Sequence, residues 1–247
     1  MSGSSSSTRL KTLAHAEWLQ LKRNPTLMSV IPVPIAIVAF LVYVVDTSTA
    51  GVAVASDAFI LMALVFFVFY SSLSMSTTRR DEKVLKRLRT GEAYDWEILT
   101  AIVIPIALLT IVQPLVAVPL AGYLNVDDVP WVNNATLMAI TITLGIVLSH
   151  GLALLTSYFT RNTEAAMITS TPVMLLAVIS QIGLRSAYPQ WLENVVQWTP
   201  YALINDLFRH GWIGGTDMIL ERLAVLLLLT LVLTWAGYRF IRWETYR

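Results

Sequence analysis

The chain contains no cysteine among its 247 residues, and charged residues make up only 13% of it. Without cysteine it can form no disulfide framework, thiol nucleophile or cysteine-based metal site. Apolar residues reach 56%, against the roughly 45–50% of soluble globular domains. They occur in runs long enough to cross a bilayer, which takes about 20 predominantly apolar residues in a helix. The composition therefore predicts an all-α integral membrane protein.

Sequence signatures of common enzyme classes are also missing. Neither the zinc-binding pattern H-E-x-x-H nor the nucleophile pattern G-x-S-x-G occurs. The phosphate-binding pattern G-x-x-x-x-G-K-[ST] is absent too, so ATP that drives this protein would be hydrolysed on a separate polypeptide. We therefore expect no enzymatic site in this chain, no cofactor or metal of its own, and no nucleic-acid partner.

Six apolar stretches are predicted to be transmembrane helices. A polar tail, residues 1–9, precedes them and is expected to be disordered, because its first eight residues are mostly Ser and Thr. The remainder, residues 10–247, is predicted to form a single membrane domain. Its spans are expected at about residues 28–46, 58–76, 98–122, 135–159, 165–184 and 218–241.

Basic residues are concentrated on one side of these spans. The loops 47–57 and 123–134 contain none, whereas the segments on the other side hold fourteen of the 17: Arg9, Lys11, Lys22, Arg23, Arg79, Arg80, Lys83, Lys86, Arg87, Arg89, Arg161, Arg239, Arg242 and Arg247. Cytoplasmic loops carry the excess of Lys and Arg in membrane proteins. We therefore expect a multi-pass plasma-membrane protein of prokaryotic origin, with both termini in the cytoplasm.

Residues 10–24, LKTLAHAEWLQLKRN, have the pattern of an amphipathic helix that lies in the cytoplasmic membrane interface. Leu10, Leu13, Ala14, Glu17, Trp18 and Leu21 fall roughly on one helical stripe. Pro25 disfavours continuation of the helix through the residue before it. This segment either couples to a partner or serves only as an anchor.

Residues 77–97, TTRRDEKVLKRLRTGEAYDWE, are the most highly charged stretch of the chain. Glu82 and Lys86 stand at the i, i+4 spacing that supports a helix. Val84, Leu85 and Leu88 give that helix an apolar edge. An amphipathic helix of this kind suits a groove on a partner protein.

Two further features concern the membrane and its outer side. The segment 185–217 is rich in large aromatic residues, namely Tyr188, Trp191, Trp198, Tyr201, Phe208 and Trp212, which predicts short helices in the outer interface. His150 is the one ionisable residue well inside a predicted span. Such residues are functional candidates, although a neutral imidazole bonded between helices is the simpler alternative.

Three segments together resemble the permeases of type-two ATP-binding-cassette (ABC) transporters. The charged loop resembles the family's coupling loop at Asp81, Glu82, Leu85, Leu88, Arg89 and Thr90, and departs from it at Lys83-Val84 and Gly91-Glu92. The N-terminal segment is similar to the family's elbow at Glu17, Arg23, Asn24, Pro25 and Pro32. The segment after the fifth span is similar at Pro172, Ser180, Pro189, Trp191, Leu192, Thr199, Pro200 and Arg209, with Gln181 in place of a usual Gly.

The resemblance implies a six-span subunit with an elbow helix, a cytoplasmic coupling helix and an external hairpin between the last two spans. It implies pairing with a second permease subunit, as a homodimer or heterodimer, and docking of a separate ATPase that binds ATP and Mg²⁺. The implied docking residues are Glu82, Leu85, Lys86, Arg87, Leu88, Arg89 and Thr90. The implied elbow residues are Glu17, Trp18, Arg23 and Pro25, and the candidate substrate path includes His150, Ser180 and Gln181.

The resemblance leaves several cargoes open. We expect export of a small hydrophobic or amphiphilic drug or antibiotic, and hence a role in antibiotic resistance. A polysaccharide or glycolipid exporter of the same family is the alternative, since exposed Tyr and Trp rings stack on sugars. The rivals outside the family are a membrane immunity protein that sequesters an apolar ligand, a membrane-embedded enzyme and a secondary transporter.

Overall fold

The computed structural model describes residues 6–45, 49–91, 93–124, 132–215 and 217–244. Residues 1–5, Glu92 and part of the predicted loops 47–57 and 123–134 lie outside these ranges. The elements are α1 (Ser6–Arg23), α2 (Pro25–Val30), α3 (Val33–Phe40), η1 (Leu41–Val45), α4 (Thr49–Ile60), η2 (Leu61–Phe69), α5 (Tyr70–Asp81), α6 (Val84–Arg89), α7 (Asp95–Tyr123), α8 (Ala135–Phe159), α9 (Ala166–Ile179), α10 (Ile182–Arg185), α11 (Gln190–Val196), α12 (Pro200–Ile213) and α13 (Ile219–Phe240), where η denotes π-helix.

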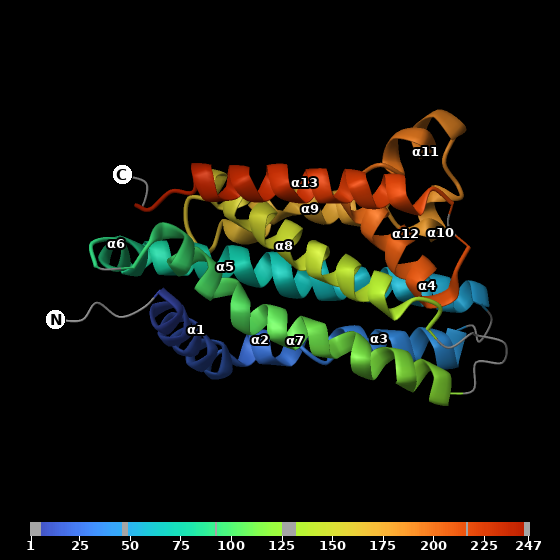
Figure 1. Cartoon of the computed structure of the whole chain (residues 1–247), viewed down its shortest axis with the longest axis horizontal. Helices are drawn as coiled ribbons and strands as arrows, with labels where there is room; N and C mark the ends of the chain where they lie inside the picture. The colour runs from blue at the N-terminus through green and yellow to red at the C-terminus, as the bar shows by residue number, and fades with distance from the viewer. Residues whose placement is uncertain (1–5, 46–48, 92, 125–131, 216, 245–247) are drawn as a thin grey trace.

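The helices form an elongated bundle (Figure 1). Helix α1, helix α6 and the C-terminal end of α13 lie at one end of the bundle, which we call the α6 end. Helices α10 and α11 lie at the opposite end, which we call the α11 end. The sequence predicts that the α6 end is cytoplasmic and the α11 end external. Helix α8 runs through the middle and packs on α13, α12, α5 and η2.

Five helical stretches of the described residues are long and apolar enough to cross a membrane: Leu27–Val44, Ala50–Asp81, Asp95–Tyr123, Ala135–Phe159 and Ile219–Phe240. The predicted span at 165–184 corresponds to α9, which has only 14 residues. Its length of about 21 Å is shorter than the roughly 30 Å hydrocarbon core of a bilayer. A sixth crossing therefore stays a prediction.

Helix α9 ends early because polar groups bind the chain at that point. Ser180 Oγ donates a hydrogen bond to the carbonyl oxygen of Leu176 at 2.6 Å and closes the last turn of the helix. The backbone is then extended for one residue, and Asp57 Oδ2 accepts a hydrogen bond from the N–H of Ile182, the first residue of α10, at 2.5 Å. The predicted span of about 165–184 therefore contains a break between α9 and α10.

The expected loop 47–57 is also wrong, since most of it is helical. Helix α4 begins at Thr49, so Asp57 lies inside a helix rather than in a connection. Its side chain is buried against the α9–α10 junction, where a hydrogen-bond donor is available to it. The N-terminal tail also differs from the expectation, because α1 begins at Ser6 and includes residues 6–9.

Two glycines allow α8 and α13 to touch along their backbones. A Cβ atom added to Gly237 of α13 would lie 2.3 Å from the carbonyl oxygen of Gly151 on α8, and one added to Gly151 would lie 2.6 Å from the Cα of Thr234. Small residues permit such close helix packing within membranes, where van der Waals contact drives association.

This contact predicts a large effect of one methyl group. Replacing Gly237 with Ala should destabilise the chain by about 1–3 kcal/mol, because backbone atoms cannot move aside as a side chain can. The matched control is Gly183→Ala, where an added Cβ meets nothing within 4 Å. Thermal unfolding of both variants in the same detergent checks this, and equal melting temperatures would contradict it.

Candidate functional site

The charged stretch around Glu82 and Lys86 is divided between the end of α5 and α6, instead of forming the single helix that their spacing predicts. Helix α5 ends at Asp81, and Lys83 adopts the left-handed conformation, with φ of +60°. The chain turns there, so Glu82 and Lys86 no longer share one helix. Lys86 Nζ instead pairs with Glu244 Oε1, at 2.9 Å.

The apolar edge of α6 faces the chain itself. Leu85 is only 1% exposed and belongs to the main hydrophobic core, and Leu88 packs against that core. The prediction that this edge is offered to a partner is therefore wrong for Leu85. What α6 presents outward is charge, on Lys86, Arg87 and Arg89.

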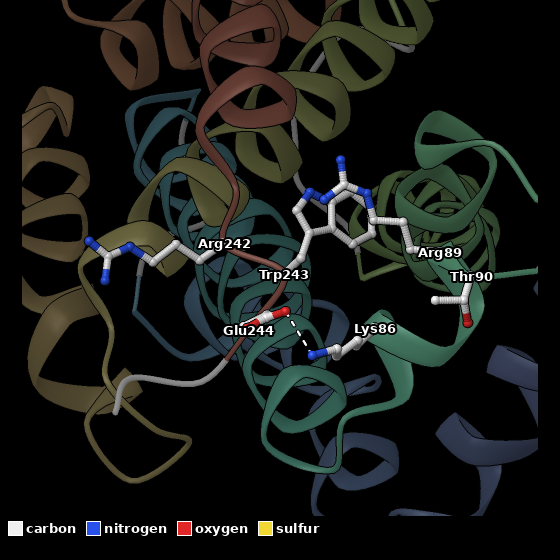
Figure 2. Close-up of a pocket in the computed structure, with 6 residues that line it drawn as sticks. All are labelled: Lys86, Arg89, Thr90, Arg242, Trp243 and Glu244. Atoms are coloured by element: carbon white, nitrogen blue, oxygen red, sulfur yellow. Dashed lines mark ion pairs between the residues drawn. The ribbon is translucent and has the colours of Figure 1, made fainter.

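The C-terminal segment after α13 lies across α6 (Figure 2). Arg89 lies over the ring of Trp243, with 4.8 Å between its guanidinium carbon and the ring centroid. Its Nε also pairs with Asp95 Oδ1 of α7 at 3.3 Å. An open surface cavity of about 610 Å³ lies between both segments and is lined by Lys86, Arg89, Thr90, Arg242, Trp243 and Glu244.

The predicted elbow is bound to α5 and α7 by ion pairs. Glu17 of α1 is buried, and its Oε2 lies 2.7 Å from Nη2 of Arg79. Arg9 pairs with the buried Glu97 of α7 at 3.1 Å. Of the other elbow residues, Trp18 is half-buried, Arg23 is exposed in the last turn of α1, and Pro25 begins α2 after the cap Asn24.

Arg80 is the most deeply buried cation of the described residues. It is 1% exposed, and its guanidinium donates to the carbonyl oxygens of Ser157 at 2.8 Å, Thr160 at 2.6 Å and Arg161 at 3.3 Å. These carbonyls lie at the C-terminal end of α8 and in the turn after it, where backbone acceptors carry partial negative charge. The arginine thus adds donors there, beside the Thr160 N–H that also binds the Ser157 carbonyl.

Asp81, the residue after Arg80, also binds α5 to the chain that follows α8. Asp81 Oδ2 accepts a hydrogen bond from the backbone N–H of Thr163 at 2.9 Å, in the turn between α8 and α9. Three consecutive side chains at the end of α5 therefore bind three different elements: Arg79 binds α1, Arg80 binds α8, and Asp81 binds the α8–α9 turn.

A second charged cluster lies at the α11 end and surrounds Asp206 of α12. Arg185 of α10 donates to both carboxylate oxygens, Arg209 Nη2 lies 3.0 Å from Oδ1, and Arg222 Nη1 of α13 lies 2.6 Å from Oδ2. Arg209 also lies 3.9 Å from Asp57 of α4. The cluster joins four helices and borders a cavity of about 260 Å³.

The electrostatics of the cluster favour the charged form of Arg185. Burial alone acts to lower the pKa of the Arg185 guanidinium, but the hydrogen bond and charge of Asp206 outweigh it and hold the pKa above its usual value. Sequence reasoning missed this cluster. One signal was available, because Arg185, Arg209 and Arg222 are the three basic residues outside the fourteen on the predicted cytoplasmic side.

The residues predicted for a substrate path do not come together. His150 is buried on α8 against the edge of Tyr238, with 6.0 Å between ring centroids; neither ring nitrogen makes a hydrogen bond of normal geometry with the described residues, although the backbone of Leu99 lies near. Ser180 and Gln181 form the α9–α10 junction. Their role in a path stays a prediction.

Comparison with known proteins gives one family. The sequence model of the ABC-2 type transporter matches residues 8–212, which run from α1 almost to the end of α12. The chain belongs to the ABC-2 type transporter family. No curated protein matches it significantly. As an ABC-2 membrane domain it is the permease component of an ABC transporter, and α13 with the C-terminal segment lies beyond the matched region.

The buried contacts of Arg80 predict a strong effect on stability. Replacing Arg80 with Met removes the guanidinium that binds the carbonyls of Ser157, Thr160 and Arg161, and should cost about 3 kcal/mol or more. The control is Arg87→Met on α6, whose exposed side chain should change stability by less than about 0.5 kcal/mol. Melting temperatures in detergent compare the two, and an unchanged Arg80→Met protein would refute the capping role.

The cluster around Asp206 predicts an equally specific effect. Asp206→Asn leaves three arginines around a neutral amide, and loss of one partner from a buried ion pair costs about 3–5 kcal/mol. Asp217→Asn is the matched control, because Asp217 borders the same cavity but is exposed. Limited proteolysis of the 185–217 segment reports the difference. Equal cleavage rates would show that the cluster does not hold the segment.

Proposed function

We propose that this chain is the permease subunit of an ABC exporter that moves a small hydrophobic or amphiphilic compound, such as a drug or antibiotic, out of the cell. ATP and Mg²⁺ bind to a separate cytoplasmic ATPase, and the permease pairs with a second permease subunit, as a homodimer or heterodimer. Family membership supports the permease role. The arrangement of α6 supports docking of the ATPase.

The observation that carries the proposal is the combination of an exposed charged face with a buried attachment. Lys86, Arg87 and Arg89 point away from the core, whereas Leu85 fixes α6 to it. A partner that binds the charged face of α6 pushes on a helix that Leu85 attaches to the core. The motion passes through α5 to α1 by Arg79 and to α8 by Arg80.

Two observations support a small apolar cargo. A cavity of about 260 Å³ between α7 and α8 is lined almost entirely by apolar side chains, among them Leu115, Val118, Met138 and Ile142. Apolar pockets with few polar groups suit small hydrophobic ligands. The alternative sugar cargo has less support than the sequence suggested, because three of the six aromatic rings in 185–217 are buried: Tyr201, Phe208 and Trp212.

The docking proposal is tested by one charge on α6. Arg87→Glu should lower recovery of the ATPase by at least about tenfold, since reversed charge at an interface repels the complementary surface. Leu88 and Arg89 are left unchanged because both make contacts inside the chain. The measurement is the molar ratio of a co-purified protein with a phosphate loop, after mild detergent extraction from the native host.

Two controls make this result specific. Arg87→Lys keeps the charge and should retain the partner, and Arg239→Glu reverses an exposed charge in the last turn of α13 rather than on α6. A normal ATPase ratio with Arg87→Glu would rule out docking at α6. If the unaltered chain brings no ATPase and binds apolar ligands without ATP, the sequestering protein becomes the better explanation.

A further inference from the structure

Two prolines interrupt the backbone hydrogen bonds of α7 in the half of the helix that lies toward the α11 end (Figure 1). Proline has no N–H, so the carbonyl oxygen four residues before it loses its usual helical partner. In α7 this applies to Thr110, before Pro114, and to Leu115, before Pro119. Within a membrane such a carbonyl needs another donor, from a neighbouring helix, a hydroxyl side chain or an ordered water.

The side-chain donors near these carbonyls bind elsewhere. Thr110 Oγ1 donates to a carbonyl one turn earlier in α7, at 2.9 Å. Gln113 Nε2 donates to the carbonyl oxygen of Ile31, also at 2.9 Å. On the facing part of α8, Thr143 Oγ1 donates back to its own helix at 2.7 Å. The acceptors that the two prolines expose are therefore available to a donor from a bound molecule.

The carbonyl of Leu115 lies at the wall of the apolar cavity between α7 and α8. Leu115 and Pro119 both line this cavity, which has a volume of about 260 Å³. Residues i and i+4 are neighbours on one face of a helix, so the carbonyl that points from the first toward the second lies on the same face. An apolar wall thus carries one hydrogen-bond acceptor.

Small side chains on α8 leave the space for this cavity. Ala135 and Ala139 stand at the i, i+4 spacing and line it across from α7. Met138 and Phe208 are buried and close its inner side, whereas Leu115 is 70% exposed at its mouth. The cavity therefore opens sideways from the bundle, toward the lipid that surrounds a membrane-spanning chain.

The lining selects the chemistry of an occupant. None of the described residues that line the cavity is charged, so a charged ligand would lose its water without a compensating partner. The ring of Phe208 and the thioether of Met138 favour contact with an aromatic ring. The volume is below the roughly 300–1,000 Å³ of typical small-molecule sites, which limits the occupant to a small molecule.

We propose that this cavity binds a small neutral phenol, with its ring against Phe208 and Met138 and its hydroxyl group donating to the carbonyl oxygen of Leu115. The hydroxyl supplies the donor that Pro119 cannot supply, and the ring fills the apolar space beside it. The proposal rests on the proposed function only for the statement that this ligand is the exported compound. Binding itself needs neither ATP nor an ATPase.

The test compares a phenol with its methyl ether. The probes para-propylphenol and para-propylanisole share an apolar body, and only the phenol carries a donor. Equilibrium dialysis of the full chain in detergent, against empty micelles, measures saturable binding of each. The unaltered chain should bind the phenol about fivefold more tightly, as expected from one net hydrogen bond. Ala139→Phe fills the cavity and should abolish saturable binding of both probes.

The variant Pro119→Ala tests the carbonyl directly. Alanine supplies the backbone N–H that proline lacks and closes the helical bond to Leu115, so the fivefold preference for the phenol should be lost. The matched control is Pro105→Ala, the same change in the same helix at a proline that does not line the cavity, and it should keep the preference. Thermal unfolding in the same detergent shows that each variant is folded.

Four results would overturn the site. Equal affinity of the unaltered chain for the two probes would show that no acceptor takes part. Saturable binding that survives Ala139→Phe would place the ligand elsewhere. A phenol preference that survives Pro119→Ala would exclude the carbonyl of Leu115. Loss of both probes in Pro119→Ala would assign the role of the proline to the shape of the helix.

The phenol site and the proposed function can fail separately. Dialysis uses the chain alone, so absence of phenol binding does not affect the docking test with Arg87→Glu. Export of para-propylphenol is measured in inverted vesicles from the native host, with and without ATP. A phenol that binds as described but is not moved with ATP would contradict its role as cargo and confirm the site.

Discussion

A cation inside a low-dielectric interior must be matched by acceptors, and Arg80 shows how this chain meets that requirement. The side chain leaves α5 and binds the carbonyl groups that end α8. Removing a guanidinium from water costs several kcal/mol unless such partners replace the water. The position of the arginine therefore fixes the separation of the two helices. Since α5 leads directly into α6, the orientation of the charged surface depends on the same contact.

Helix α8 carries this constraint to the opposite end. Its N-terminal side is bound to α12, because the backbone N–H groups of Asn133 and Asn134 donate to the carbonyls of Trp212 and Gly211 at 3.1 and 2.7 Å. In the middle, the contact of Gly151 with Gly237 leaves no space for α13 to slide past it. A continuous path of helices joined by hydrogen bonds and close packing thus connects the α6 end with the Asp206 cluster. Well-packed elements with few alternative arrangements transmit displacement over such distances.

The sequence predicted the features that depend on long local patterns. The range 135–159 agrees with α8 at both ends, because Asn134 caps the helix and a continuous apolar run follows it. Predictions failed where distant residues decide the outcome. Asp57 was predicted to lie in a loop, because its sequence neighbours do not show that the N–H of Ile182 in α10 binds its carboxylate. Leu85 was predicted to lie on the apolar edge of a surface helix. The left-handed turn at Lys83 instead directs it into the core. The Asp206 cluster unites four helices, and no local pattern relates them.

The two ends of the bundle use their charges differently, and this difference bears on transport. At the α6 end the pairs Arg9–Glu97, Arg79–Glu17 and Lys86–Glu244 are separate contacts between different elements, so each can break alone. At the α11 end three arginines share the carboxylate of Asp206, so separation of one helix leaves charge unbalanced for all. The contacts at the α6 end can therefore change one at a time. The helices around Asp206 can only keep their arrangement or release it together.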